Sequence, residues 1–325
     1  MTNYIFAEAP RQDAVITFAE LGNRELQLLK SVANWDSPNE WKQLIIGAQG
    51  RSVLFQSPDR KLTLEDMLHG NYDGIQLVGG GGNMVYVQNG TIILPSTVTI
   101  NQPDRTNYSN ELKRITELRE VNDTGLFEFS NRAYVPLHGM DISEARNRKK
   151  FTAFLNEVIA DYRERNLRLT FTVPKLAAEG YFPGMLDDSG NPLQFQVYRA
   201  PRLKRLPGQA FDYIKNENNI LGLVGALMRT SYLMGCSLRT FHSFDLAYMD
   251  GHPGNVSFIK ANGNTALYTT DLGSMKELSQ KKFPERYKAM DLYQYLVTSS
   301  NVVSDLLIYK LDLDAEAFGK TKISY

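Results

Sequence analysis

The spacing of apolar positions divides the chain into a helical start, a strand-rich middle and a helical end. Apolar residues recur at helical spacing in ITFAELGNRELQLLKSV, and Thr63 is a predicted N-cap for the short helix LEDML, whose Glu65 and Asp66 suit a first turn. Residues 1–70 are therefore expected to form a mainly helical N-terminal extension. Such an extension can dock a protein partner.

From Asp73 onward the pattern changes to short runs of β-branched and aromatic residues. The runs GIQLV, NMVYVQ and GTIILP are separated by a glycine run and by Asn89-Gly90, which is a strong hairpin signal. The runs RITELREV, LFEFS and AYVPL continue the strand pattern. A small antiparallel sheet is predicted within residues 73–138.

The glycine run between QLV and MVYV has two interpretations. Gly80, Gly81 and Gly82 can let backbone N–H groups approach phosphates, as a nucleotide-covering loop does. The alternative is a flexible hairpin turn, in which case the loop at residues 122–125 competes for the nucleotide-covering role.

Longer helical patterns follow. Ser143 precedes EARNRKKFTAFLNEVIADYRER, whose apolar residues share one helical face, so a helix is predicted over 143–165. The strands LRLTFTV and LQFQVYRA come next, and Pro201 begins a basic extended stretch. Helices are predicted at about 217–234 and 284–310.

Composition narrows the class of protein. The 325 residues suit two lobes better than one core, and Lys plus Arg equals Asp plus Glu at 36 each, so no net charge draws the chain to nucleic acid or anionic membrane. The single Cys236 excludes an internal disulfide. The start of the chain resembles no signal peptide, and the apolar segment 220–235 is too short to span a bilayer, so a cytoplasmic protein without a membrane span is expected.

The stretch from Leu238 to Ser274 carries the chemistry. Two short strands, VSFI and ALYTT, flank a turn sequence, KANGNT, and so predict a hairpin with Asn255 just before it and Asp271 just after it. An amide oxygen and a carboxylate are ligands that Mg²⁺ accepts beside phosphate and water. Asp250, five residues before Asn255, can accept a proton from an acceptor hydroxyl or hold it in line.

This stretch resembles the catalytic and metal loops of protein-kinase-like phosphotransferases, above all the atypical branch with aminoglycoside, choline and fructosamine kinases. Their loop reads roughly L-H-x-x-G-x-x-H-x-D-x-H-P-x-N, and this chain has FHSFDLAYMDGHPGN without a gap. The resemblance implies that Asp250 is catalytic, that Asn255 and Asp271 bind metal, and that the cofactors are ATP and Mg²⁺. It covers some 36 residues closely.

The implied fold class is α+β, with two lobes that share a cleft. An N-lobe at 71–200 would hold a small antiparallel sheet and one long helix, and a mainly helical C-lobe at 201–325 would hold the catalytic and metal loops. In this arrangement Val197 and Tyr198 would form the hinge whose backbone contacts adenine, although an ordinary edge strand is the alternative.

Some positions depart from the family's pattern. Tyr248 stands where the family has a mainly architectural histidine, and Met249 replaces the arginine of conventional protein kinases. The strand before helix 143–165, AYVPLHG, lacks the nucleotide-binding lysine. Glu144 or Glu157 remains as its acidic partner, and the phosphate-binding cation is left open among Arg132, Lys113, Arg146 and residues elsewhere in the chain.

Three further residues are expected to support the loop. His252 and His242 have predicted structural roles, and Asp291 in KAMDLYQYL is expected to anchor the C-lobe and brace the catalytic loop, with a free surface carboxylate as the alternative.

The sequence therefore favours an ATP- and Mg²⁺-dependent phosphotransferase that acts on an unidentified hydroxyl of a protein or small molecule. The missing lysine keeps two alternatives open. One is a kinase-like nucleotidyltransferase that transfers AMP, and the other is a nucleotide-binding pseudokinase or scaffold.

Overall fold

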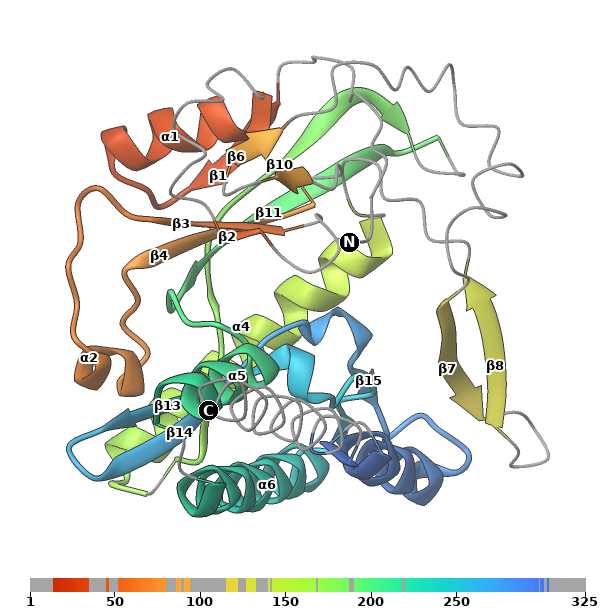
Figure 1. Ribbon diagram of the computed structural model, residues 1–325. Helices are drawn as coiled ribbons and strands as arrows, with labels where there is room; N and C mark the ends of the chain where they lie inside the picture. The colour runs from red at the N-terminus through yellow and green to blue at the C-terminus, as the bar shows by residue number, and fades with distance from the viewer. Residues whose placement is uncertain are drawn as a thin grey trace, which may run out of the picture. The chain divides into compact units, whose positions relative to one another are not determined.

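The computed structural model describes most of the chain (Figure 1). The described residues are 14–34, 45–46, 52–79, 86–88, 91–93, 115–121, 127–132, 140, 142–167, 169–186, 190–217, 220–297, 299–300 and 303. They form an α+β structure of two compact units, the first made of residues 1–161 and 173–202 and the second of residues 162–172 and 203–325.

A six-stranded antiparallel sheet forms the centre of the first unit. Its strands, in spatial order, are β1 (Val15–Ala19), β10 (Lys175–Leu186), β11 (Pro192–Ala200), β4 (Gly74–Val78), β3 (Ser52–Gln56) and β2 (Ile45–Ile46). The hairpin β10–β11 is joined to β4 through pairs such as Val197 with Leu77. The sheet therefore unites segments that lie more than 100 residues apart in the sequence.

Helix α1 (Asn23–Asn34) covers one face of this sheet. Leu29 of α1 belongs to a cluster of eight buried apolar residues. The other seven come from four strands of the sheet and are Phe55, Ile75, Leu77, Ala178, Phe182, Phe195 and Val197. Because strand side chains alternate between faces, these residues recur at every second position of β4 and β11. Burial of a large apolar side chain such as these leucines and phenylalanines contributes about 1.5–3 kcal/mol, so this cluster stabilises the packing of α1 on the sheet.

Helix α4 (Ile142–Glu164) begins at the opposite face. Ala145 and the preceding Met140 pack against Val78 and Tyr198. The Gln196 side chain donates to the Ala145 carbonyl at 2.8 Å, and the Tyr198 hydroxyl donates to Gln196 Oε1 at 2.7 Å. The predicted helix at 143–165 is confirmed.

A buried ion pair fixes α1 to the sheet. Glu25 in the first turn of α1 binds the Arg199 guanidinium with both carboxylate oxygens, with Nη2 to Oε2 at 2.6 Å, and also accepts from Ser57 Oγ and from the Gly22 N–H at 3.0 Å. Burial raises the pKa of Glu25, but the hydrogen bonds from Arg199, Ser57 and Gly22 outweigh it and lower this pKa to about 2.

Other parts of the first unit are short. Thr63 caps α2 (Leu64–Leu68) in a capping box with Asp66, which confirms the predicted N-cap. Two hairpins, separate from the main sheet, follow β4. They are β5 (Tyr86–Gln88) with β6 (Thr91–Ile93), and β7 (Ile115–Val121) with β8 (Phe127–Arg132).

Residues 1–70 differ from the expected helical extension. Besides α1 and α2 they supply β1, β2 and β3, which belong to the main sheet. The segment VITFA was read with the helical pattern of the residues that follow it, but its β-branched and aromatic residues pair with β10. Likewise, the described strands within 73–138 do not form one sheet, because β4 pairs with β3 and β11, while β5–β6 and β7–β8 are separate hairpins.

The second unit combines helices with a small mixed sheet. The helices are α5 (Leu206–Glu217), α6 (Ile220–Ser243) and a helix at residues 284–297. The strands are β9 (Phe171–Thr172), β13 (Val256–Ala261) and β14 (Asn264–Thr269) in one sheet, and β12 (Leu246–Ala247) with β15 (Lys276–Glu277) in another.

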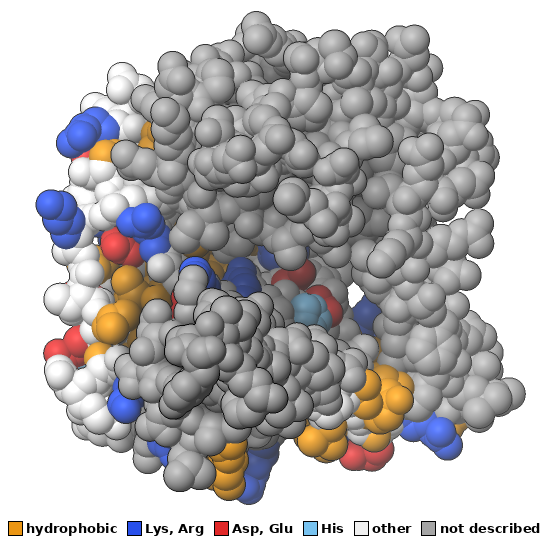
Figure 2. Space-filling model, viewed as in Figure 1, with side chains coloured by type: hydrophobic (Ala, Val, Ile, Leu, Met, Phe, Trp, Pro, Cys, Tyr) orange, Lys and Arg blue, Asp and Glu red, His pale blue; other side chains and the backbone are white. Residues whose placement is uncertain are grey.

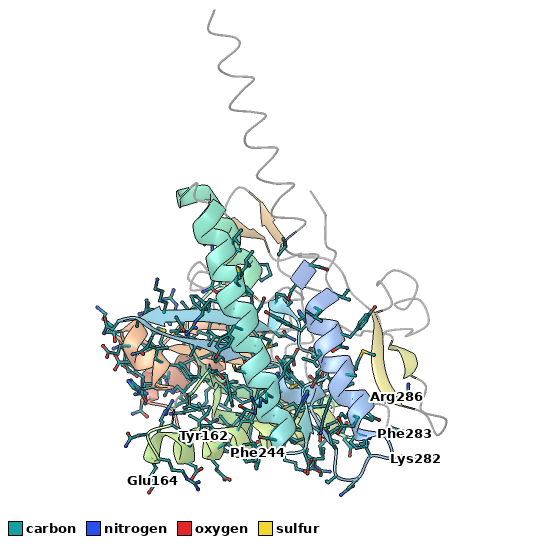
Figure 3. All side chains as sticks on the ribbon, turned by 90° about the horizontal axis from the view of Figure 1, so that it is seen from below. Tyr162, Glu164, Phe244, Lys282, Phe283 and Arg286 are labelled. Atoms are coloured by element: carbon teal, nitrogen blue, oxygen red, sulfur yellow. The ribbon has the colours of Figure 1, made fainter. Side chains whose placement is uncertain are left out.

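In Figure 3 the helix from residue 284 runs opposite in direction to α6, and Phe244 and Phe283 lie at the same end of the two helices. The Leu278 N–H donates to the Asp245 carbonyl at 2.7 Å near this end. The helical segments predicted at 217–234 and 284–310 are thus present, with altered bounds within the described residues.

We expect Glu25→Gln to lower the free energy of unfolding by about 3 kcal/mol at pH 7, because it leaves the buried Arg199 guanidinium without a counter-charge. The pKa of Glu25 is about 2 in the folded protein and about 4.5 when unfolded, so this stabilisation is present above pH 4.5 and is lost as the pH falls toward 2. Urea unfolding between pH 7 and pH 3 measures both effects.

The more exposed pair of Glu179 with Lys149 supplies the control, and Glu179→Gln should change the stability by less than about 1 kcal/mol. A Glu25→Gln deficit as small as the control's, or one of equal size at pH 7 and pH 3, would contradict the assigned role of the pair.

Candidate functional site

The hairpin β13–β14 brings Asn255 and Asp271 together. Val256 pairs with Thr269, and the hairpin turns at Asn262-Gly263, where both residues have positive φ angles of 49° and 79°. Past the last pair the Thr270 N–H donates to the Asn255 carbonyl at 3.0 Å, so the ladder extends to the residue before Asp271. The predicted hairpin is confirmed.

The Asn255 side chain also contacts Asp250. Its Nδ2 donates to Asp250 Oδ2 at 2.7 Å and to the Asp250 carbonyl at 3.2 Å, which closes the loop between them. Asn255 is only 9% exposed, and it is the last residue of the short helix η2 (Pro253–Asn255). Since Nδ2 is committed to Asp250, the amide oxygen of Asn255 is the atom that can face a cation.

His252 caps η2 and orders the same loop. Its Nδ1 accepts from the Gly254 N–H at 3.0 Å, so the ring proton lies on Nε2, which is 3.4 Å from Asp250 Oδ1. Burial lowers the pKa of His252, the Asp271 charge opposes this effect and Arg205 adds to it. A neutral His252 that holds the Asp250 carboxylate and the turn agrees with the predicted structural role.

Asp291 braces the loop from inside, as predicted. It lies on the helix at 284–297, is fully buried, and accepts the Tyr248 N–H at 2.7 Å and the Met249 N–H at 2.6 Å. His242 Nε2 at the end of α6 lies 3.0 Å from the same carboxylate. These hydrogen bonds satisfy a buried charge and confirm the brace over the surface alternative.

Asp271 adopts a left-handed backbone conformation, with φ 58° and ψ 52°, before the short helix η3 (Leu272–Ser274). The Tyr248 hydroxyl donates to the carbonyl of the preceding residue, Thr270. Residue-level reasoning left Tyr248 without a specific role, because nothing local in the sequence indicates a bond across 22 positions.

These donors suit Mg²⁺ bound with phosphate better than Mg²⁺ bound by protein alone. Among the described residues no group of three or more His, Cys, Asp and Glu side chains can hold a metal ion. Asp271 and Asn255 offer one carboxylate and one amide oxygen, and Mg²⁺ typically takes one or two protein carboxylates with phosphate and water for the rest. The donor set therefore fits a Mg²⁺ ion that is bound together with phosphate oxygens.

Acidic and basic side chains gather around a histidine on the face of the molecule shown in Figure 2. Arg205 of the second unit lies over the Tyr268 ring, with the guanidinium carbon 5.7 Å from the ring centre.

The predicted nucleotide contacts of the first unit are supported less well. Gly80, Gly81 and Gly82 lie outside the described residues. Val197 and Tyr198 are buried in β11, which has β10 on one side and β4 on the other. Because their backbone groups face neighbouring strands, this placement gives no support to a contact with a nucleotide base.

The acidic partner proposed on α4 has another role within its helix. Glu144 lies 3.3 Å from Arg148, one turn later, and both side chains are largely buried. Sequence reasoning considered Arg146, which is exposed, and missed Arg148. The i,i+4 spacing of Glu144 and Arg148 was the available signal. Lys113 lies outside the described residues, and so do the surroundings of the Arg132 side chain.

No model of a known protein family matches the chain, and no curated protein matches it as a relative. None of the helices in the described part of the chain is both long enough and apolar enough to cross a membrane.

Asp291→Asn is the sharpest test of the brace. The amide keeps the shape but turns one acceptor into a donor that faces a backbone N–H, so we expect a loss of about 3 kcal/mol in the free energy of unfolding. Urea unfolding measures this loss. The control is Asp245→Asn, at an exposed position whose φ of 55° asparagine tolerates. Equal stabilities of the two variants would show that Asp291 does not brace the loop.

Proposed function

We propose that the chain is an ATP- and Mg²⁺-dependent phosphotransferase that acts on a hydroxyl of a protein or small molecule. The observation that carries the proposal is the linked set Asp250, Asn255 and Asp271. Asn255 bonds the Asp250 carboxylate at 2.7 Å with its side chain and the residue before Asp271 at 3.0 Å with its backbone. Three oxygen-bearing side chains are thus held on two adjoining loops.

Each side chain has its own task. Asp271 and the amide oxygen of Asn255 would hold the Mg²⁺ ion. When Mg²⁺–ATP is bound, ATP would supply the phosphoryl group and Mg²⁺ would neutralise charge on the phosphates. Asp250 presents its carboxylate to the acceptor hydroxyl and takes its proton, or aligns it for attack. The Nδ2–H of Asn255 holds the Asp250 carboxylate and His252 Nε2 lies 3.4 Å from its other oxygen, so little reorganisation is needed at the reaction.

We further propose that the fold is that of the protein-kinase-like family, with an N-lobe and a C-lobe. The order of elements supports this fold. Four strands of the antiparallel sheet and the long helix α4 come before β10 and β11, which complete the sheet. Then follow α6, the loop with Asp250, the hairpin β13–β14, Asp271 and a helix that carries the bracing Asp291. The segment FHSFDLAYMDGHPGN has the same place in this order as the family's catalytic loop.

One observation favours nucleotidyl transfer as a second candidate. The strands of the main sheet before α4 read VITFA, II, SVLFQ and GIQLV, and they contain no lysine for the nucleotide phosphates. A nucleotide held without that lysine can bind in another pose and expose its α-phosphate to the acceptor. ADP as product indicates phosphoryl transfer, and pyrophosphate indicates nucleotidyl transfer.

Asp271→Ala tests the proposal. We expect turnover of ATP to fall at least about 100-fold, because the only carboxylate assigned to the metal is removed, while the fold is kept. Incubation with ATP and MgCl₂, followed by mass spectrometry of the nucleotides, measures turnover and identifies the product. Asp212→Ala removes a half-exposed acid on α5, paired with Lys204, as a control. Undiminished turnover in Asp271→Ala would refute the metal role.

A further inference from the structure

Each of the two residues joined by one hydrogen bond, Tyr248 and Thr270, is followed by a residue with a strained backbone. Met249 and Asp271 both have left-handed backbone conformations, with φ angles of 62° and 58°, which few residues other than glycine adopt. Each directly follows one partner of the bond from the Tyr248 hydroxyl to the Thr270 carbonyl. Such strained conformations persist only where the surrounding contacts hold them.

Tyr248 is itself fixed at both ends. Its backbone N–H is bound by Asp291, and its ring packs edge-on against Phe241 of α6, with the ring centres 5.9 Å apart. The side chain is fully buried, so water cannot replace the protein as a hydrogen-bond partner of the Thr270 carbonyl. Thr270 is held on its other side, where its N–H donates to the Asn255 carbonyl.

We propose that Tyr248 is a positioning residue for the metal. Its hydroxyl ties the loop that carries Asp250 to the loop that carries Asp271, and so sets the backbone from which the Asp271 carboxylate projects. This inference rests on the metal role proposed for Asp271. Loss of the hydroxyl releases the Thr270 carbonyl and lets the strained Asp271 relax away from Asn255, which weakens the binding of the metal–nucleotide complex.

Isothermal titration of the purified full chain with Mg²⁺–ATP tests this role. We expect Tyr248→Phe to raise the Kd about five- to tenfold, the effect of one lost hydrogen bond of ordinary strength. The control is Tyr287→Phe, at another buried tyrosine, in the helix at 284–297, and it should change the Kd less than about twofold. Thermal unfolding of both variants shows whether the fold is kept.

A double-mutant comparison separates positioning from general stability. In an Asp271→Ala background the metal carboxylate is absent, so the additional Tyr248→Phe change should leave the remaining ATP affinity unaltered. A Tyr248→Phe effect no larger than the control's, or one that persists in full beside Asp271→Ala, overturns the inference while the proposed function stands. Failure of the wild-type chain to bind Mg²⁺–ATP overturns both.

A measurement that keeps the hydroxyl covers the case in which Tyr248→Phe does not fold. With 3-fluorotyrosine at position 248, the ¹⁹F resonance should shift when Mg²⁺–ATP is added, because the ring is bonded to the residue before the metal ligand. An unchanged resonance with bound Mg²⁺–ATP would contradict the link.

Discussion

A buried carboxylate is costly unless its oxygens are hydrogen-bonded, and Asp291 meets this condition by accepting the backbone N–H groups of Tyr248 and Met249. These two residues immediately precede Asp250. Because Asp291 lies on a separate helix, the loop that carries Asp250 takes its conformation from the packing of that helix and of α6, whose His242 contacts the same carboxylate. The positions of Asp250, Asn255 and Asp271 all depend on this anchored backbone.

The site concentrates unfavourable local conformations and offsets them with hydrogen bonds. The left-handed turns at Met249 and Asp271 each cost free energy, and bonds to the buried backbone around them hold both in place. The bond from Asn255 to the Asp250 carboxylate uses Nδ2 of Asn255, so its amide oxygen is the other polar atom of that side chain. The loop is thus held by bonds to its backbone and by the buried side chains of the helices beside it.

Local signals predicted the parts of this site that are formed by neighbouring residues. The Asn262-Gly263 turn predicted the hairpin, and the hairpin placed Asn255 beside Asp271; the helical period predicted α4, and Thr63 predicted a cap. Partners that lie far apart in the sequence could not be predicted. The bonds of Glu25 to Arg199 and of Tyr248 to Thr270 join residues 174 and 22 positions apart, and no local periodicity relates such pairs. For the same reason β1 and β3 were assigned to helical surroundings, although their partners are later strands.

Titration of the wild-type chain with ATP in the presence and absence of Mg²⁺ tests the central claim most directly. If the carboxylate of Asp271 and the amide of Asn255 hold a cation only together with phosphate oxygens, ATP binds with measurable heat when Mg²⁺ is present and at least about tenfold more weakly without it. Equal binding under both conditions, or no binding in either, would contradict the claim that these residues form a metal–nucleotide site.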